Sequence, residues 1–228
     1  MVCGSGLLAK AFSAFRDDDR VLIHAAGVSN SLETDARAFA REKARLRRAR
    51  EEHPQKLLVY FGTCSADDPD RRETPYVAHK LEMEAFLERL ASPWMVLRLP
   101  LAIGPGRRGR TLAPYLYERI SRGEPFEVWE NATRYPIDVV DALRIARRLI
   151  DVPAYWNRRI NVALRAFPVP EFVRVMESIV GQPAVCRRVP KGRHYVIDCP
   201  EVRGLDSELA LDYTERYLER VLRKYFAG

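Results

Sequence analysis

Short apolar runs alternate with longer helical patterns through the first half of the chain. The apolar runs are VLIHAAG from Val21, KLLVYFGT from Lys56 and WMVLRLPLAIG from Trp94, and each has the character of a strand buried on both faces. DARAFAREKARLRRAREEH and YVAHKLEMEAFLERL lie between them and have helical spacing. Strands that alternate with helices build βαβ units. The sequence therefore predicts an α/β fold with a Rossmann-like doubly wound parallel sheet.

The pattern changes after Gly104, where a loop rich in glycine and arginine precedes shorter elements. We expect a strand and then a helix within PFEVWENATRYPIDVVDALRIARRLID, and a strand near HYVIDC. Further helices are expected at LAPYLYERISRG, PEFVRVMESIVG and SELALDYTERYLERVLRKYF. Residues 1–103 should thus form one domain, with a small interleaved C-terminal lobe made mainly from residues 104–228.

The composition is that of a globular protein. Of the 228 residues, 47% are hydrophobic and 30% are charged, so the chain can bury a sizeable core. No apolar run is long enough to span a bilayer, and MVCGSGLLAKAF lacks the basic start and the cleavage site of a secretory signal. We therefore expect no membrane partner and a cytoplasmic location.

The net charge of +7 suits an anionic partner, which is a nucleic acid, an acidic surface or a small molecule that carries phosphate. Nucleic-acid binding through ARLRRAR is disfavoured, because acidic residues interrupt the basic run and no aromatic platform accompanies it. The cysteines form no CxxC pair and have no histidine at metal-ligand spacing, so we expect neither a metal site nor a disulfide framework. They are Cys3, Cys64, Cys186 and Cys199.

GSGLLA, at residues 4–9, fits a GxGxxA turn between a strand and a helix. Small residues let the backbone approach a pyrophosphate, and a helix N-terminus turns free N–H groups toward negative charge. Glycine pairs also mark ordinary turns, so this motif alone is weak.

Tyr76 and Lys80 stand four residues apart at the start of a predicted helix, so their side chains share one face. An ammonium beside a phenol lowers its pKa, which would let Tyr76 exchange a proton with a substrate oxygen near neutral pH. Alone, the spacing is more typical of a surface Tyr and Lys. FGTCS changes that interpretation, because Thr63 or Ser65, at the preceding strand end, could donate a hydrogen bond to the same oxygen.

The order of these features resembles that of the extended short-chain dehydrogenase/reductases, the NAD-dependent epimerase/dehydratase family, of which this chain would be an unusually short member. VLRLPLAIGPG, RYPIDVVDALRIA and RINVAL also resemble segments of that family, so the likeness covers nearly the whole chain. It implies an NAD(P)-binding domain at residues 1–103 and a substrate-binding lobe at residues 104–228. Residues 135–150 would return to the first domain.

The resemblance also implies residue roles. Tyr76 would be the catalytic acid and base, and Lys80 would bind the nicotinamide ribose and tune the tyrosine. Thr63 matches the family's hydroxyl position better than Ser65. The implied cofactor contacts, besides Tyr76 and Lys80, are Gly4, Ser5, Gly6, Leu7, Leu8, Ala25, Ala26, Gly27, Pro100, Leu101 and Ile103.

Two positions depart from the family pattern. Only FRDDDR stands between the first helix and VLIHAAG, where the family carries further strands and the residue that selects NAD or NADP. Residues 17–19 could mimic an acidic ribose contact but are more typical of a solvated loop, so the sequence does not choose between the two cofactors. Glu42 stands near the helix position where many relatives have a catalytic asparagine.

Arginines of the second half suit a phosphate-bearing substrate, since a guanidinium binds phosphate oxygens bidentately. Relatives place a phosphate-binding arginine close to Arg134, whereas the GRRGR loop, with Arg108 and Arg110, is equally well read as a solvated loop. Ser29 and Asn30 could contact a sugar, although Ser29, Asn30 or Ser31 could instead cap the following helix. The candidate substrate contacts are Ser29, Asn30, Arg107 and Arg134.

The resemblance implies an NAD(P)-dependent oxidoreductase that acts on a nucleoside diphosphate sugar in surface-polysaccharide or related biosynthesis. Reduction of a keto-sugar is favoured over epimerisation and dehydration, because these usually recruit extra acids and bases and no convincing pair stands near Thr63. The alternative is a non-catalytic dinucleotide-binding or protein-interaction module of the same fold. The family's helix pairing also implies a homodimer.

Overall fold

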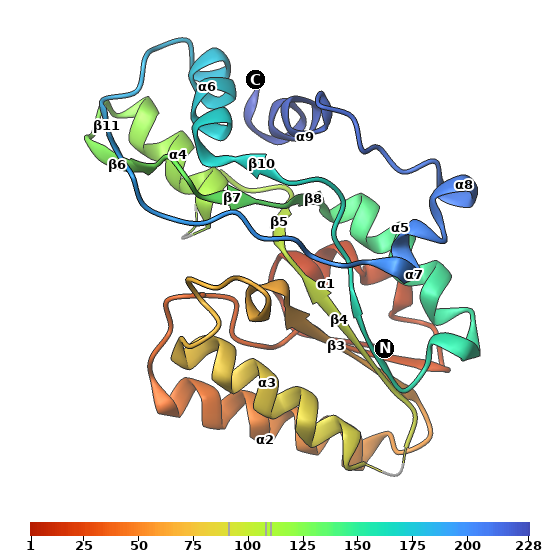
Figure 1. Ribbon diagram of the computed structural model, residues 1–228. Coiled ribbons are helices and arrows are strands. Elements are labelled where there is room, and N and C mark those ends of the chain that lie inside the picture. The colour runs from red at the N-terminus through yellow and green to blue at the C-terminus, as the bar shows by residue number, and fades with distance from the viewer. Residues whose placement is uncertain (91, 108, 110) are drawn as a thin grey trace.

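The computed structural model describes residues 1–90, 92–107, 109 and 111–228 (Figure 1). The first half contains β1 (Val2–Cys3), α1 (Leu7–Ala11), η1 (Ser13–Phe15), β2 (Val21–His24), α2 (Ala36–Glu52), β3 (Leu57–Thr63), η2 (Cys64–Ala66), α3 (Pro75–Glu88), β4 (Trp94–Leu99) and β5 (Leu101–Ile103). The second half contains α4 (Leu112–Ser121), β6 (Phe126–Trp129), β7 (Thr133–Arg134), β8 (Pro136–Asp138), α5 (Val139–Ile150), η3 (Pro153–Tyr155), β9 (Arg158–Asn161), β10 (Phe167–Pro168), α6 (Val169–Val180), β11 (Cys186–Val189), α7 (Pro200–Arg203), α8 (Asp206–Leu209) and α9 (Tyr217–Phe226). None of the helices in these ranges combines the length and the apolar character needed to cross a membrane.

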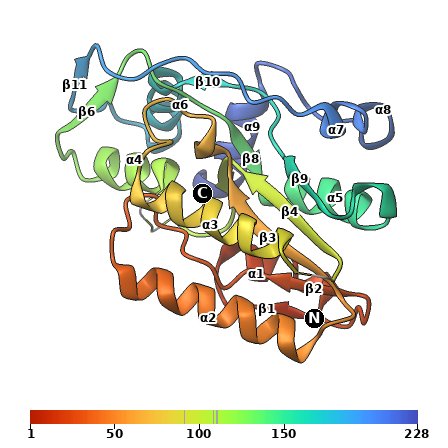
Figure 2. The same cartoon turned by 60° about the horizontal axis from the view of Figure 1, so that its bottom comes forward.

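A five-stranded sheet forms the centre of the fold. Its strands lie in the order β1-β2-β3-β4-β9, and every neighbouring pair is parallel. Helices cover both faces, with α2 and α3 side by side on one face and α1 and α5 on the other (Figure 1, Figure 2). Every residue of β3 is buried, as in a strand covered on both sides. The predicted α/β fold with a Rossmann-like parallel sheet is confirmed.

Alternate residues along the central strands supply two separate hydrophobic cores. Leu58 and Tyr60 of β3 pack in one core with Leu46 of α2 and Leu87 of α3. Val59, which lies between them, belongs to the larger core that α1 and α5 cover. Successive side chains of a strand point to opposite faces of the sheet, so a strand with helices on both faces needs apolar residues at every position. This explains why the strands appear in the sequence as unbroken apolar runs.

The run WMVLRLPLAIG forms β4 and β5, so the single strand expected there is wrong. Pro100 separates the two strands, because its ring nitrogen has no hydrogen to donate to a sheet. β4 belongs to the central sheet, whereas β5 pairs in parallel with β8. The chain therefore leaves the central sheet at Pro100 and enters the second half of the fold.

Short strands and helices of the second half lie beyond the carboxyl ends of the central strands (Figure 1). The strand expected near HYVIDC is wrong, because residues 194–199 form no strand, and β11 pairs with β6 instead. The Tyr135 side chain makes hydrogen bonds with the backbone of HYVIDC that a neighbouring strand would otherwise make. Its hydroxyl donates to the Tyr195 carbonyl oxygen at 2.9 Å and accepts from the Ile197 N–H at 3.2 Å.

The helix expected along SELALDYTERYLERVLRKYF is broken into α8 and α9. Ala210 follows α8 with a φ of 46°, a left-handed conformation that ends a helix. Asp212 then accepts hydrogen bonds from the N–H and the hydroxyl of Thr214, which compete with helical hydrogen bonding. The helical pattern resumes only at α9.

Elements of the second half complete the central sheet. β9 is its fifth strand, paired with β4, and α5 packs against α1. The division into residues 1–103 and 104–228, with residues 135–150 returning to the first domain, stays a prediction.

Leu87→Ala is expected to lower the free energy of unfolding by about 2–5 kcal/mol, because Leu87 is fully buried and its removal leaves a cavity. The control is Leu81→Ala on the same helix. Leu81 is 38% exposed, so this change should cost less than about 1 kcal/mol. Urea denaturation followed by circular dichroism measures both, and equal losses would contradict this orientation of α3.

Candidate active site

A cleft of about 900 Å³ lies at the carboxyl ends of the central strands, where ligands bind in open α/β sheets. Its floor consists of the segments at those strand ends, which are residues 4–8, 24–29, 61–65 and 99–106. Side chains of the second half, such as Tyr115, form the opposite wall. The parallel sheet and the second half of the chain thus contribute to one site.

Most of the predicted site residues line this cleft. They are Gly4, Ser5, Gly6, Leu7, Leu8, Ala25, Ala26, Gly27, Ser29, Thr63, Tyr76, Lys80, Pro100, Leu101, Ile103 and Arg134. Segments distant in the sequence therefore meet at one cleft.

Asn30 and Arg107 do not line the cleft. The Asn30 side chain accepts a hydrogen bond from the Leu32 N–H at 3.1 Å. The Arg107 guanidinium lies over the Tyr117 ring and donates to the Gly228 carbonyl oxygen. Both side chains thus contact other parts of the chain, and Arg108 and Arg110 lie outside the described residues.

The helix that follows Ser29 and Asn30 is capped by another residue. Asp35 precedes α2, and its carboxylate accepts a hydrogen bond from the Arg37 N–H at 2.8 Å. The alternative interpretation of Ser29 and Asn30 as caps of this helix is therefore wrong.

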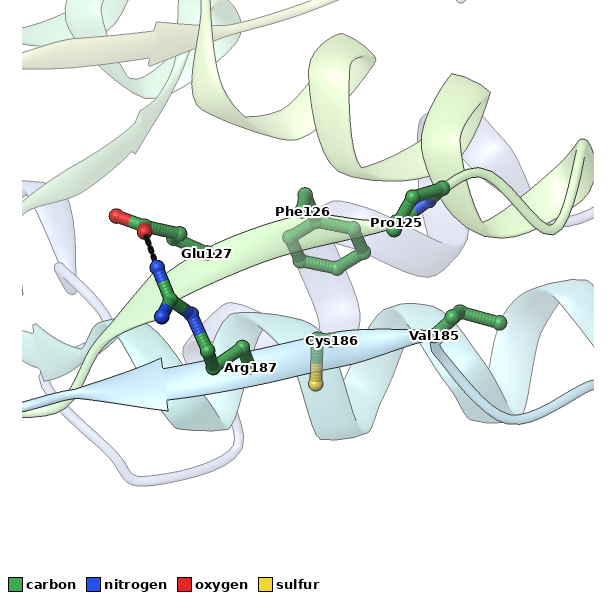
Figure 3. A pocket seen from close by; sticks show the side chains of 6 residues that line it. All are labelled: Pro125, Phe126, Glu127, Val185, Cys186 and Arg187. Carbon is green, nitrogen blue, oxygen red and sulfur yellow. Dashed lines mark hydrogen bonds and ion pairs between the residues drawn. The ribbon is translucent and has the colours of Figure 1, made fainter.

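A second, smaller pocket of about 430 Å³ lies along β6 and β11 (Figure 3). An ion pair between Glu127 and Arg187 crosses its lining, which otherwise presents Phe126, Val185 and Cys186. None of the predicted site residues lines it. The larger cleft is therefore the candidate site.

Local sequence fixes where α3 begins. The Thr74 hydroxyl accepts a hydrogen bond from the Val77 N–H, and Pro75 occupies the first helical position, where a missing N–H costs no helical hydrogen bond. Tyr76 consequently lies in the first turn of the helix, at the cleft.

Tyr76 is protonated at neutral pH in this structure. Its side chain lines the cleft, but the residue is only 8% exposed. Burial raises the pKa of Tyr76 to about 12, the Thr63 hydroxyl lowers it through a hydrogen bond, and the negative charge of Glu42 raises it. The expectation of a lowered Tyr76 pKa is therefore wrong for this arrangement.

Lys80 directs its charge away from Tyr76. Its Nζ lies 6.0 Å from the centre of the Tyr76 ring, and it donates to Glu42 Oε1 at 2.9 Å, Tyr60 Oη at 3.1 Å and the Phe61 carbonyl oxygen at 3.3 Å. An ammonium has three hydrogens to donate, so these contacts use all of them. The Lys80 ammonium is therefore bound by buried acceptors of the protein and not by Tyr76.

Glu42 is the centre of this buried network. Oε1 accepts from Tyr60 at 2.5 Å and from Lys80, and Oε2 accepts from the Val28 N–H at 2.7 Å and contacts His79 Nε2 at 3.0 Å. Burial alone would raise the pKa of Glu42, but the hydrogen bond with His79, the Lys80 charge and the Tyr60 hydroxyl together hold this pKa well below its usual range. Glu42 is therefore a carboxylate.

Gly27 is packed directly against this ion pair. A Cβ at Gly27 would lie 2.6 Å from Glu42 Oε1 and 2.9 Å from Lys80 Nζ. Real Cβ atoms do not approach other heavy atoms so closely, so glycine lets the cleft floor meet the network.

Two guanidinium groups and one carboxylate meet at one corner of the cleft. Arg134 Nη1 and Arg71 Nε lie 3.6 and 3.9 Å from Asp68 Oδ2, and Arg71 also donates to Ser31 Oγ at 3.1 Å. Asp68 is buried, and one carboxylate balances only one of the two positive charges. This corner of the cleft suits an anionic group.

The model of the NAD dependent epimerase/dehydratase family matches residues 5–163, which is most of the chain. The chain belongs to this family. No curated protein matches the chain.

Solved structures share the family fold. UDP-glucose 4-epimerase from Thermotoga maritima, solved with UDP-glucose, has a TM-score of 0.68 and 19% identity over 96% of this chain and 81% of that chain. The Thermus thermophilus UDP-glucose 4-epimerase, in complex with NAD, has a TM-score of 0.69 and 15% identity over 94% of this chain and 80% of that chain. RMD from Pseudomonas aeruginosa, complexed with NADPH, has a TM-score of 0.73 and 17% identity over 97% of this chain and 95% of that chain.

Several residues at the cleft or buried behind it were not predicted. Arg71 and Asp68 stand in a loop whose charge pattern looks solvated, and no motif singles them out. Tyr60 and His79 look like an ordinary strand residue and an ordinary helix residue. Only the unusual Glu42 gave a signal, because it stands near the position of the family's asparagine.

Gly27→Ala is expected to lower the free energy of unfolding by about 2–4 kcal/mol, because the new methyl group would push Glu42 and Lys80 apart in the interior. Gly204→Ala is the control. A Cβ there has no contact closer than 3.4 Å, so the change should stay within about 0.5 kcal/mol. Thermal or urea unfolding measures both, and a neutral Gly27→Ala would show that the pair is not packed as described.

His24 is expected to make the fold sensitive to mild acid. Both ring nitrogens are buried without a hydrogen-bond partner among the described residues, and burial lowers the pKa of His24 to about 4. The His24 side chain therefore binds a proton near pH 6.5 in the unfolded chain but only near pH 4 in the folded chain. As the pH falls from about 6.5 to 4, up to about 3 kcal/mol of the free energy of unfolding is lost. Urea unfolding at pH values between about 7 and 4.5 should show this loss in the wild type and a smaller one in His24→Leu. Identical pH dependence of the two chains would exclude it.

Proposed function

We propose that the chain is an NAD(P)-dependent oxidoreductase that acts on a nucleoside diphosphate sugar, with reduction of a keto-sugar as its reaction. The observation that carries the proposal is the placement of Tyr76 and Thr63 together in a cleft at the carboxyl ends of parallel strands. Membership of the epimerase/dehydratase family supports the same chemistry.

The strand ends fit a dinucleotide. Gly4 has a φ of 123°, and a Cβ there would lie 2.4 Å from the Ala25 carbonyl oxygen, so glycine lets the turn after β1 lie close against the end of β2. We assign cofactor contacts to residues 4–8, to residues 25–27 and to Pro100, Leu101 and Ile103. The complexes of the Thermus protein with NAD and of the Pseudomonas protein with NADPH support this assignment. The bound, reduced cofactor would supply a hydride to a substrate carbon.

Tyr76 would donate a proton to the substrate oxygen. A raised pKa keeps the phenol protonated at neutral pH, which suits proton donation in reduction better than proton abstraction in oxidation. The Thr63 hydroxyl, which hydrogen-bonds with Tyr76, would orient the same oxygen. Lys80 would reach a nicotinamide ribose only by giving up one of its present contacts.

The substrate would bind across the cleft from the sheet. Arg134 and Arg71 would hold a diphosphate, and their shared neighbour Asp68 leaves one positive charge for it. Ser29, at the cleft, would contact the sugar. The UDP-glucose in the Thermotoga protein is a ligand of this class.

The cellular setting follows from the family resemblance alone. A role in surface-polysaccharide or related biosynthesis, a cytoplasmic location and a homodimer formed through paired helices stay predictions.

A second candidate function is a non-catalytic module of the same fold. The observation that favours it is the capture of Lys80 by Glu42, which leaves the lysine with no free hydrogen for a cofactor. Calorimetry with NADH and NADPH, run beside turnover assays on keto-sugar nucleotides, separates the two functions, because this candidate requires binding without turnover.

Tyr76→Phe is expected to lower kcat by about 10²–10⁴-fold while dinucleotide affinity stays within a few-fold, since the change removes one proton donor and keeps the ring. Tyr155→Phe, outside the cleft, is the matched control and should retain full activity. Absorbance of NADH or NADPH is followed with a panel of nucleoside diphosphate keto-sugars. Unchanged turnover in Tyr76→Phe would overturn the assigned mechanism.

A further inference from the structure

Four titratable side chains form a buried cluster behind the cleft: Glu42 from α2, Tyr60 from β3, and His79 and Lys80 from α3. Each residue is at most 5% exposed. An apolar group of the same size often stabilises a protein as well as a buried ion pair does, so stability alone is a weak reason for such a cluster. Its position beside Tyr76 gives it a second role.

We propose that Glu42 is a positioning residue that draws the Lys80 ammonium toward Tyr60 and Phe61 and balances its charge, so that Lys80 does not favour ionisation of Tyr76. The proposal rests on the proposed function, because it takes Tyr76 as the proton donor. It goes beyond that function in naming the group that keeps the lysine charge away from Tyr76.

The geometry of Lys80 carries the first step. Lys80 stands one helical turn after Tyr76, so an unpaired ammonium would be free to approach the phenol on the same helix face. Its Nζ instead lies 4.8 Å from the centre of the Tyr60 ring and 6.0 Å from that of Tyr76. The three acceptors of Lys80 all lie on the Tyr60 side, and Glu42 is the only charged one among them.

The second carboxylate oxygen holds Glu42 in this orientation. Oε2 is fixed by the Val28 N–H at 2.7 Å and by His79 at 3.0 Å, while Oε1 contacts Lys80 and Tyr60. Rotation of the carboxylate would break contacts with three different elements. Glu42 therefore acts as a fixed anchor for the ammonium.

Several titratable groups around the cluster are either neutral or paired with a partner outside it. His24 of β2 is neutral at neutral pH, since burial lowers its pKa to about 4. Glu84 of α3 is paired with Arg98 of β4 at 2.6 Å. Burial keeps the Tyr60 phenol protonated by raising its pKa, and burial does the same for the Cys64 thiol. Burial lowers the pKa of Lys80 and the Glu42 carboxylate raises it, so Glu42 both keeps Lys80 charged and holds that charge on the Tyr60 side.

The test is a tyrosinate titration that needs neither cofactor nor substrate. Absorbance of Glu42→Gln is compared with that of Glu42→Gln/Tyr76→Phe, and the wild type with Tyr76→Phe, so that each difference reports Tyr76 alone. The wild-type pair should show no Tyr76 ionisation below about pH 11, whereas the Glu42→Gln pair should show it about one to two pH units lower than the wild type. A folded Glu42→Gln chain whose Tyr76 ionises as in the wild type would overturn the proposal.

A matched control is Glu82→Gln. Glu82 of α3 forms an ion pair with Lys43 of α2, which also joins the two helices, but both side chains are exposed. This change should therefore leave the pH at which Tyr76 ionises unchanged. If it moved Tyr76 as far as Glu42→Gln does, the effect would be a general one of charge, and the proposal would fail.

A second comparison covers the case in which Glu42→Gln does not fold. Lys80→Met leaves the Glu42 charge beside Tyr76, and Glu42→Gln/Lys80→Met removes both charges. The proposal predicts Tyr76 ionisation at a higher pH in the single variant than in the double one, and equal midpoints would contradict it. Because the titration is independent of turnover, it can fail while the Tyr76→Phe test of the reaction succeeds, and the reverse.

Discussion

The buried carboxylate of Glu42 joins the elements that surround the cleft. From α2 it reaches the loop after β2 through Val28, β3 through Tyr60, and α3 through His79 and Lys80. A carboxylate in the interior needs all of these partners, because an unpaired buried charge is strongly destabilising. The hydrogen bonds to the Glu42 carboxylate therefore hold α2 and α3 against β3 and the loop after β2. Tyr76 lies in the first turn of α3, so the same contacts help to position it.

The central sheet was predictable because burial on both faces demands apolar side chains at consecutive positions. β2 and β3 therefore stand out in the sequence as runs, and the helices between them as periodic patterns. The mistakes occurred where one residue or one side chain decided the backbone. Pro100 divided an apolar run, Ala210 ended a helix, and the Tyr135 hydroxyl took hydrogen bonds that a strand would have supplied. None of these effects has a periodic signal.

The candidate site was predictable to the extent that its residues follow strand ends. Parallel strands bring their carboxyl ends to one edge, so Thr63 and Tyr76 could be placed in one cleft from their order alone. Spacing did not reveal what Lys80 contacts, since its partner Glu42 lies 38 residues earlier in a helix rich in charged residues that looks fully solvated. Asn30 and Arg107 were expected to contact a substrate, but their side chains lie outside the cleft lining, where Asn30 accepts from Leu32 and Arg107 donates to Gly228.

The central claim is that a hydride passes between a nicotinamide cofactor and a sugar carbon in the cleft that holds Tyr76. The most direct measurement uses NADH and NADPH deuterated at the transferring position, a panel of nucleoside diphosphate keto-sugars, and mass spectrometry of the sugar products. Deuterium should appear in the sugar of at least one product, and Tyr76→Phe should abolish this transfer. Tight binding of either dinucleotide with no deuterium in any product would contradict it and would favour the non-catalytic module.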